Sequence, residues 1–547
     1  MVASALRTAL AQGYGWAALR TDLLAGATVG LVALPLAMAL AFASGVAPIH
    51  GLATCVMAGG ITALCGGSRF NVTGPTAAFV AVLVPIVAAH GLGGLVLATM
   101  LAGILLVIFG WAKFGRFIQF IPYPVTAGFT VGIGTVIAVL QIEDLLGLQG
   151  VERAPHLPER FLSIVSHLPA WHMPDALFGL ATIAGILLWT RWAGGPLRRI
   201  PAPLAILGAI TALAAFLPSV WPDFEVQTVA GRYGEVPRGF PEFHLPWNLP
   251  GADGEPLHLS FGLLRELAGP AFAIALLASI ESLLCAVVSD GMAGTRHNPN
   301  SELVGLGLGN LAAALFGGIA ATGAIARTAT NVRSNAASPL AAAFHAAFVL
   351  VALLLLAPLL GHLPLAALAG LLLIIAWNMA DVPHVLHVLR SAGRGDRLVL
   401  LTCWLLTVAL DMTAAVVVGI VLASVLFIRR MADMTGVQMV DEAAPDAGSA
   451  ERTPGIVRYR IAGPLFFGAA QKAMSALRRL PRDTRVLVLD LAAVPTMDFT
   501  GFVALETAVT NLEKMGVQVT ISGASPGIRA FLQGAGWQEK HPAAPLI

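Results

Sequence analysis

Apolar segments of helical length recur along most of the chain, and they leave one broad class of fold open. We count fourteen segments, at 21–43, 47–66, 74–90, 94–112, 121–143, 176–192, 199–218, 264–289, 301–318, 324–336, 339–360, 363–380, 397–411 and 412–428. Hydrophobic residues make up 57% of the 547 residues and charged residues only 11%, whereas a soluble domain carries about 25% charged residues. Several segments are shorter than the roughly 20 residues that cross a bilayer as a helix. The sequence therefore predicts an α-helical polytopic membrane protein with 14 transmembrane segments.

Basic residues indicate which loops face the cytoplasm. If the segments alternate in direction, the basic residues that flank them fall on the side of the N-terminus, as the positive-inside rule requires. These residues are Arg7, Arg20, Lys113, Arg116, Arg191, Arg198, Arg199, Arg296, Arg390, Arg394, Arg397, Arg429 and Arg430. The opposite loop, 219–260, carries six acidic residues against two arginines. We therefore expect both termini to be cytoplasmic.

The composition changes near residue 436, which predicts a second domain. A polar stretch, "DEAAPDAGSAERTPG" at 441–455, is typical of a linker. Beyond it, strand-like runs ("GIVRYRIAG", "TRVLVLDLAAV", "VQVTISG") alternate with amphipathic helical runs, which favours a small α/β domain. We predict a cytoplasmic N-terminal segment at 1–20, a transport domain at 21–430, a linker at 431–454 and the α/β domain at 455–541.

Two short helices are predicted to begin in the middle of the membrane. One follows "SRFNVTGP" (68–75) and the other follows "GGIAATG" (317–323). They occupy matching places in two halves of seven segments, about 21–218 and 264–428. Because seven is an odd number, the second half would have the opposite orientation in the membrane to the first. Interrupted helices at matched positions of an inverted repeat point to a transporter site. Because each helix start carries unpaired N–H groups and a partial positive charge, the two starts together would bind an anion.

Two of the charged residues within the apolar segments are candidates for function. Arg327, in "TGAIARTATNVRS", is predicted in the first turn of the second short helix, where it would add a full positive charge to the anion site. The alternative is an arginine that caps backbone carbonyls or pairs with a carboxylate. Glu281, in "ASIESLLCAVVSD", is a candidate for carrying a proton or ligating sodium. Its alternative is a salt bridge, with Arg327 as the partner.

Several motifs, in this order, resemble the sulfate permease (SulP) family of anion transporters. They are "LPLAMALA", "GGSRFNVTGPTAA", "NSELVGLGLGN", "TGAIARTATNVRS" and "VLDLAAVPTMDFTG". The resemblance covers about 15–541, and the stretch 278–310 is most similar to the bacterial DauA-type dicarboxylate branch. It implies a seven-plus-seven inverted repeat divided into core and gate domains, a C-terminal STAS domain (sulfate transporter and anti-sigma-factor antagonist) and a homodimer.

The resemblance also implies the residues of the anion site. They lie on the first, third and tenth segments: Leu36, Leu40, Thr76, Ala77, Ala326, Arg327 and Thr328. Glu281 matches the acidic position that serves cation coupling in family symporters. Many members have Gln where this chain has Leu36, so a polar contact expected for sulfate is missing. In the STAS turn Phe499 follows Asp498 where phosphorylated STAS proteins have Ser, which argues against a phosphorylation switch at that position.

We therefore predict a secondary active transporter in the bacterial inner membrane. It would import a C4-dicarboxylate such as fumarate, succinate or aspartate together with protons. Sodium-coupled bicarbonate transport and proton-coupled sulfate transport are the alternatives within the fold. Cys285, one turn from Glu281, is a poor ligand for sodium, which favours protons. An anion channel and a sensor acting through the STAS domain, with a cytoplasmic partner, are alternatives of other classes. No catalytic motif indicates an enzyme, and we expect no cofactor, metal or nucleic acid.

Overall fold

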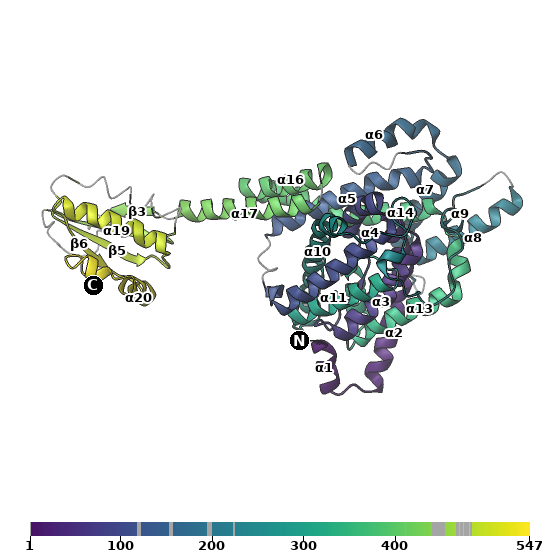
Figure 1. Cartoon of the computed structure of the whole chain (residues 1–547), viewed down its shortest axis with the longest axis horizontal. Helices are drawn as coiled ribbons and strands as arrows, with labels where there is room; N and C mark the ends of the chain where they lie inside the picture. The colour runs from purple at the N-terminus through teal and green to yellow at the C-terminus, as the bar shows by residue number, and fades with distance from the viewer. Residues whose placement is uncertain are drawn as a thin grey trace. The chain divides into compact units, whose positions relative to one another are not determined.

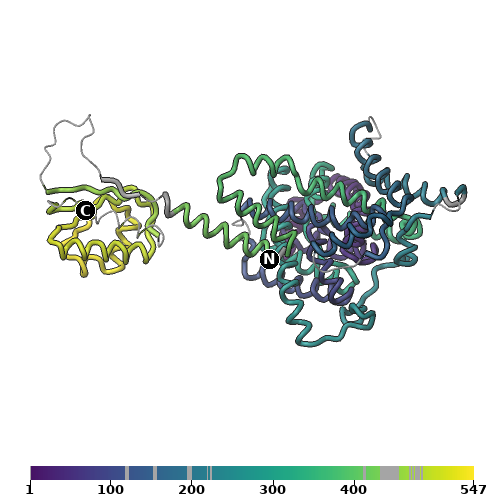
Figure 2. Tube along the Cα trace, turned by 90° about the horizontal axis from the view of Figure 1, so that it is seen from above, coloured from purple at the N-terminus to yellow at the C-terminus, as the bar shows by residue number. Residues whose placement is uncertain are grey.

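The computed structural model describes residues 2–116, 122–151, 157–193, 200–221, 225–410, 412–434, 436–439, 455–466, 470, 474, 481 and 484–547. It divides into two compact units, Met1–Ile420 and Val421–Ile547, which are described separately. The first unit is helical, and Figures 1 and 2 show that helices of its two halves, purple to blue and teal to green, lie among one another.

The helices of the first half are α1 (Ser4–Ala11), α2 (Trp16–Ala43), α3 (Pro48–Cys65), α4 (Ala77–Trp111), α5 (Tyr123–Leu145), α6 (Leu157–His167), α7 (Met173–Trp192) and α8 (Ala202–Val220). Those of the second half are α10 (Phe261–Ala293), α11 (Pro299–Leu315), α12 (Ile325–Arg333), α13 (Leu340–Gly361), α14 (Leu365–Ala380), α15 (Val382–Ser391), α16 (Arg394–Ala409) and α17 (Met412–Met434), with the short α9 (Val229–Tyr233) between the halves. Two two-residue strands, β1 (Thr73–Gly74) and β2 (Thr322–Gly323), precede α4 and α12.

Each of the fourteen predicted segments falls on a helix. Two of them share α4, which is divided at Gly91, where φ is +64°. A left-handed backbone at this position favours glycine, and a Cβ there would also clash with the backbone of Gly251. Nine helices within the described part are long and apolar enough to cross a membrane. Because α4 carries two segments, these nine helices account for ten of the fourteen, and the shorter α8, α11, α12 and α16 account for the other four.

The helices pack as two bundles. The first bundle contains α2, α3, α4, α10, α11, α12 and α13, and the second contains α5, α6, α7, α8, α14 and α16. The pairs within them mirror one another: α2 packs against α13 as α10 packs against α4, and α5 packs against α16 as α14 packs against α7. This exchange of partners is the pattern of an inverted repeat, in which each bundle takes helices from both halves of the chain.

Glycine pairs allow close approach inside the first bundle. A Cβ on Gly307 of α11 would lie 2.7 Å from the Gly103 carbonyl oxygen of α4, and a Cβ on Gly103 would lie 3.0 Å from the Gly307 carbonyl oxygen. Small residues at such crossings are the usual way for helices to associate in lipid. The tight contact between α4 and α11 therefore depends on residues that carry no side chain.

We predict that Gly307→Val destabilises the protein by about 1–3 kcal/mol, because the added carbons overpack this crossing. Gly208→Val is the matched control, since a Cβ at helical Gly208 meets nothing within 4 Å. The midpoint of thermal unfolding is measured for both purified variants in detergent, with the loss of monodispersity as the readout. Equal midpoints for the two variants would contradict the proposed role of the crossing.

The second unit contains a four-stranded sheet in the order β3 (Gly436–Met439), β4 (Ile456–Ala462), β5 (Val486–Ala493) and β6 (Gln518–Ser522). β3 is antiparallel to β4, whereas β4, β5 and β6 run parallel. Helices α19 (Phe499–Lys514), α20 (Pro526–Gly534) and α21 (Trp537–Lys540) follow the later strands. The α/β prediction is confirmed, with a core in which Leu487 and Leu489 pack with Phe502, Leu505 and Trp537.

The predicted linker at 431–454 is only partly described. It includes the last turn of α17 and strand β3, which the sequence analysis missed because "GVQMV" is too short to display a period. Residues 440–454 lie outside the described residues. The domain boundaries given above therefore stay predictions.

A buried aspartate supports the sheet of this unit. Burial alone would raise the pKa of Asp490, but the Ala492 N–H and the guanidinium groups of Arg460 and Arg458 outweigh it and hold the pKa below its usual value. The Asp490 carboxylate accepts hydrogen bonds from Ala492 N (3.0 Å) and Arg460 Nε (3.0 Å). A lowered pKa means that this contribution is complete above the unfolded value of about 3.9 and is lost as the pH falls through the folded value.

We predict that Asp490→Asn raises local opening of β5 at neutral pH by roughly fivefold, the effect of losing about 1 kcal/mol of hydrogen bonding. Hydrogen exchange of the β5 amides in the full-length protein measures it. Unchanged exchange in the variant would show that the carboxylate charge contributes nothing to the sheet.

Candidate functional site

The two short strands cross inside the first bundle and bring two helix starts together. β1 and β2 are buried and pair antiparallel, with Thr73 opposite Gly323 and Gly74 opposite Thr322. The Ala324 N–H extends the pairing by donating to the Val72 carbonyl at 2.9 Å. Extended backbone at membrane depth requires such internal partners, because lipid supplies none. Since the strands are antiparallel, α4 and α12 leave the crossing in opposite directions.

Neither helix start has a side-chain cap. Thr76 precedes α4 and Ala324 precedes α12, both in extended conformation, and neither side chain accepts a hydrogen bond from the first turn. The Phe79 N–H donates to the Thr76 carbonyl at 3.2 Å, and the other N–H groups at the two helix starts are available to a ligand. The adjacent positive ends of the two helix dipoles make this crossing the candidate anion site of the described chain.

A buried glutamate that the sequence analysis did not single out holds the approach to β1. Glu302 of α11 is 1% exposed. One of its carboxylate oxygens accepts hydrogen bonds from the Gly67 and Ser68 N–H groups at 2.8 and 2.9 Å. The other accepts from Asn71 Nδ2 at 2.6 Å and Ser282 Oγ at 3.2 Å. Four donors on one carboxylate fix the extended segment that leads into the site.

An asparagine on the same helix performs the matching task for β2. Asn310 accepts a hydrogen bond from the Ala321 N–H at 2.8 Å and donates to the Ala321 carbonyl at 3.0 Å. Thr54 of α3 bonds the backbone of Ile319 in a similar manner. Glu302 and Asn310 both belong to "NSELVGLGLGN". Two polar side chains in an otherwise apolar helix were the available signal, because such residues in membrane helices are seldom without a role.

Arg327 lies beneath the crossing rather than open to it. Its side chain is fully buried. Its guanidinium donates to the Pro75 carbonyl, and Nη1 lies 3.5 Å from Cys55 Sγ. A side chain at Gly74 would clash with the same guanidinium. This is the carbonyl-binding alternative of the sequence analysis, and it places a full positive charge directly behind the start of α4.

Glu281 lies at the start of α4. It comes from α10, is half-buried, and accepts a hydrogen bond from Thr76 Oγ1 at 3.0 Å. Within the described residues no carboxylate lies within ion-pair distance of Arg327, so the predicted alternative of a Glu281–Arg327 salt bridge is wrong for this structure. Glu281 therefore presents its carboxylate to the place where the helix starts would attract an anion.

The other predicted site residues differ in their surroundings. Thr76 and Leu36 are half-buried and Ala326 is exposed, whereas Ala77 and Leu40 are buried. Thr328 is also buried, and its hydroxyl accepts a hydrogen bond from the Val72 N–H at 2.9 Å and donates to Asn71 Oδ1 at 3.2 Å. Thr328 thus supports the strand crossing. The assignment of this set to anion binding stays a prediction.

Comparison with known proteins agrees with the two-unit fold described above. The sequence matches the sulfate permease family over residues 19–403 and the STAS domain over residues 448–545. The chain belongs to the sulfate permease family. It is therefore a multi-pass membrane transporter of anions and not an enzyme.

Relatives cover nearly the whole chain. It is 37% identical to the "Putative sulfate transporter YvdB" of Bacillus subtilis, over 94% of this chain and 93% of that protein. It is 30% identical to the "Bicarbonate transporter BicA" of a Picosynechococcus species, over 94% and 90%. The fold is that of the murine Solute Carrier 26 family member A9 anion transporter, with a TM-score of 0.81 at 19% identity, covering 95% of this chain and 88% of the other. The dicarboxylate branch suggested by residues 278–310 does not appear among these relatives.

We predict that Glu302→Ala destabilises the protein by about 3 kcal/mol or more, because it leaves buried backbone N–H groups without acceptors. Glu266→Ala is the control, since Glu266 is exposed on α10. Thermal stability in detergent is the measurement. A loss for Glu302→Ala no larger than that for Glu266→Ala would exclude a supporting role for this carboxylate.

Proposed function

We propose that this transporter is a secondary active symporter that moves a small divalent anion together with a proton. The observation that carries the proposal is the hydrogen bond between Glu281 and Thr76 at the start of α4. While Glu281 is ionised, its carboxylate repels a second anion from the same helix start. Protonation removes that charge, so the proton and the anion bind together.

The charges around the crossing favour a divalent anion. Each helix start contributes about half a positive charge, and Arg327 adds one more behind them. An ionised Glu281 offsets roughly half of this total. A monovalent anion would therefore be balanced without a proton, whereas a divalent anion is balanced once Glu281 is protonated. Charge balance at the site thus links the anion's charge to the coupling ion.

The surroundings of Glu281 favour a proton over sodium. Sodium, a hard cation, prefers several oxygen ligands. In the described residues the Glu281 carboxylate contacts the hydroxyl of Thr76. One turn further along α10 stands Cys285, whose sulfur lies 3.1 Å from Thr328 Oγ1. A thiol at that position supplies a poor sodium ligand, whereas a proton requires the carboxylate alone.

Two divalent substrates fit this scheme. The name of the Bacillus relative supports sulfate. The predicted wall of Leu36, Leu40, Ala77 and Ala326 supports a C4-dicarboxylate, whose carbon chain would pack on apolar side chains. Sodium-coupled bicarbonate transport is the rival with a monovalent anion, and the name of the cyanobacterial relative supports bicarbonate as the substrate.

The cellular setting completes the proposal. We expect a bacterial inner-membrane protein, functional as a homodimer, with both termini in the cytoplasm. The transport domain at 21–430 would move its core bundle against its gate bundle, and the STAS domain at 455–541 would provide a site for dimerisation or for a cytoplasmic partner.

Uptake into proteoliposomes tests the function directly. Labelled sulfate, fumarate and bicarbonate are each supplied with an inward proton gradient, an inward sodium gradient or neither. Acceleration of sulfate or fumarate uptake by protons supports the proposal. Acceleration of bicarbonate uptake by sodium alone would replace it with the rival.

We predict that Glu281→Gln abolishes acceleration by the proton gradient but retains exchange of labelled anion across the membrane, because the neutral amide mimics the protonated acid. Glu266→Gln, an exposed position on the same helix, should behave like the parent protein. If Glu281→Gln still responds to protons, Glu281 is not the coupling residue.

We predict that Arg327→Ala lowers uptake at least about tenfold, the effect of losing roughly 1.4 kcal/mol of attraction for the anion. Arg327→Lys keeps the charge and should recover part of the uptake. Thermal stability of both variants separates loss of binding from loss of the contact with Pro75. Wild-type uptake by a folded Arg327→Ala variant would rule out an electrostatic role.

A further inference from the structure

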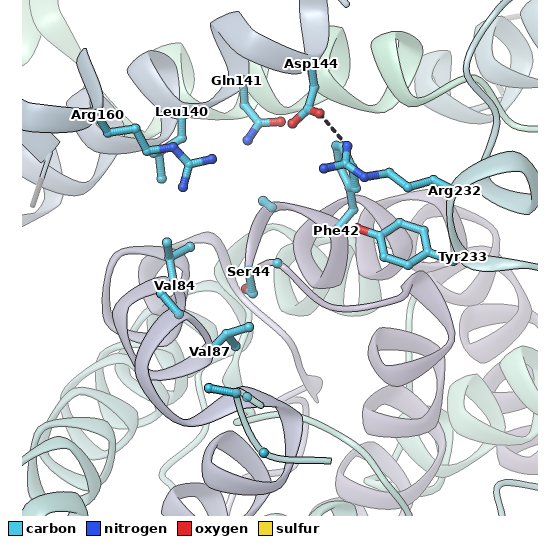
Figure 3. Close-up of a pocket in the computed structure, with 16 residues that line it drawn as sticks. Phe42, Ser44, Val84, Val87, Leu140, Gln141, Asp144, Arg160, Arg232 and Tyr233 are labelled. Carbon is cyan, nitrogen blue, oxygen red and sulfur yellow. Dashed lines mark hydrogen bonds and ion pairs between the residues drawn. The ribbon is translucent and has the colours of Figure 1, made fainter. Parts of the chain in front are cut away.

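A pocket of about 290 Å³ lies between the two bundles, away from the strand crossing. Figure 3 shows its walls: Phe42, Ser44, Val84 and Val87 come from α2, α4 and the turn after α2, while Gln141 and Asp144 come from α5. These three helices belong to segments one, three and five, which run in the same direction. The pocket therefore lies at the side of the membrane opposite the N-terminus, the outer side under the predicted orientation.

One face of α4 leads from the candidate anion site to this pocket. Ala77, Ala81, Val84 and Ala88 follow the i, i+4, i+7, i+11 spacing of a single helix face. Ala77 stands at the helix start, and Val84 and Ala88 line the pocket. Eleven residues of helix span about 16 Å. A second, smaller pocket is lined by Ala81 and Val84 of the same face. This face of α4 is therefore the candidate route from the first pocket to the anion site.

Arg232 of α9 stands at the mouth of this route and contacts both bundles. Its Nη1 lies 2.8 Å from Asp144 Oδ1 at the end of α5, in the second bundle. Its guanidinium lies 5.6 Å from the centre of the Phe42 ring at the end of α2, in the first bundle. The Tyr233 ring meets Phe42 edge-on at 6.4 Å. The segment around α9 contacts both bundles: α9 packs against α13 of the first bundle, and the preceding Gln227 N–H donates to Asp175 of α7 in the second.

A neighbouring ion pair provides an internal comparison. Arg160 lines the same pocket, and its Nη2 lies 3.0 Å from Glu143 Oε2, one residue before Asp144. Both partners, on α6 and α5, belong to the second bundle. The Arg160–Glu143 pair therefore stays intact when the bundles move apart, whereas Arg232 must lose its contact with either Phe42 or Asp144.

We infer that Arg232 forms the outer gate of the transport route: held by Asp144, it clamps Phe42 and thereby joins the two bundles on the outer side. A cation over an aromatic ring, partly shielded from water, is attractive enough to bias two conformations. In the conformation described here the clamp is closed. Opening of the anion site to the outside requires Arg232 to give up its contact with Phe42 or with Asp144. The inference rests on the proposed transport function but not on the identity of the anion.

The test measures access to the route and needs no substrate. Ala81→Cys places a small thiol in the wall of the second pocket. Native Cys55, Cys285 and Cys403 are buried and Cys65 is half-buried. A membrane-impermeant maleimide is applied to either face of membranes that contain the full-length protein, with the parent chain as background. With Arg232→Gln added, labelling from the outer face should rise roughly threefold or more. Labelling from the inner face should fall, because the outward-open population grows at the expense of the other.

Matched variants decide between a gate and general loosening. Arg160→Gln removes the pair within one bundle and should leave labelling from both faces unchanged. Phe42→Leu should mimic Arg232→Gln, and the double variant should add little to either, because both changes remove the same contact. Equal effects of Arg160→Gln and Arg232→Gln, increased labelling from both faces, or no change with Arg232→Gln and Phe42→Leu would each overturn the inference. Uptake by the same variants is scored separately, so failure of the gate is distinguishable from failure of the proposed symport.

Discussion

The pairing of β1 with β2 is the interaction on which the rest of the transport domain depends. Two stretches of extended backbone lie inside a helical bundle, where unpaired amide groups would be costly. Each stretch supplies the hydrogen-bonding partner of the other. The pairing also fixes where α4 and α12 begin and sets them in opposite directions. The candidate anion site therefore follows from how the chain satisfies its own backbone.

Buried polar side chains make that pairing specific. Glu302 and Asn310 approach the two strands from α11, while Thr54 does so from α3. Buried polar groups stabilise a structure only when their hydrogen bonds are complete. Here their side chains form hydrogen bonds with the backbone that leads into the strands. The pairing of β1 with β2 therefore has little freedom to shift in register. Close packing of α4 on α11, through Gly103 and Gly307, brings these side chains within reach.

The placement of charge distinguishes the two faces of the crossing. Arg327 is buried behind it and bonded to the chain, so its charge acts as a fixed part of the site. Glu281 is half-buried in front of it and bonded to Thr76, so its charge can change by protonation. A fixed cation and a titratable anion on one site suit coupled transport better than a channel. Where the two bundles meet, Arg232 and Asp144 form an ion pair, to which we assign a part in movement instead of binding.

The sequence by itself determined the class of fold, the fourteen segments and the two interrupted helices, because hydropathy and helix-breaking residues act locally. It also determined strands β4, β5 and β6 and helices α19 and α20 of the STAS domain, whose residues show a strand or helix period, but it missed the short strand β3. Only the tertiary structure decided what Arg327 and Glu281 contact, because their partners lie 252 and 205 residues away. The same holds for Glu302, whose partners lie up to 235 residues away. A pattern in sequence records that a charge is buried, whereas long-range packing decides which group it meets.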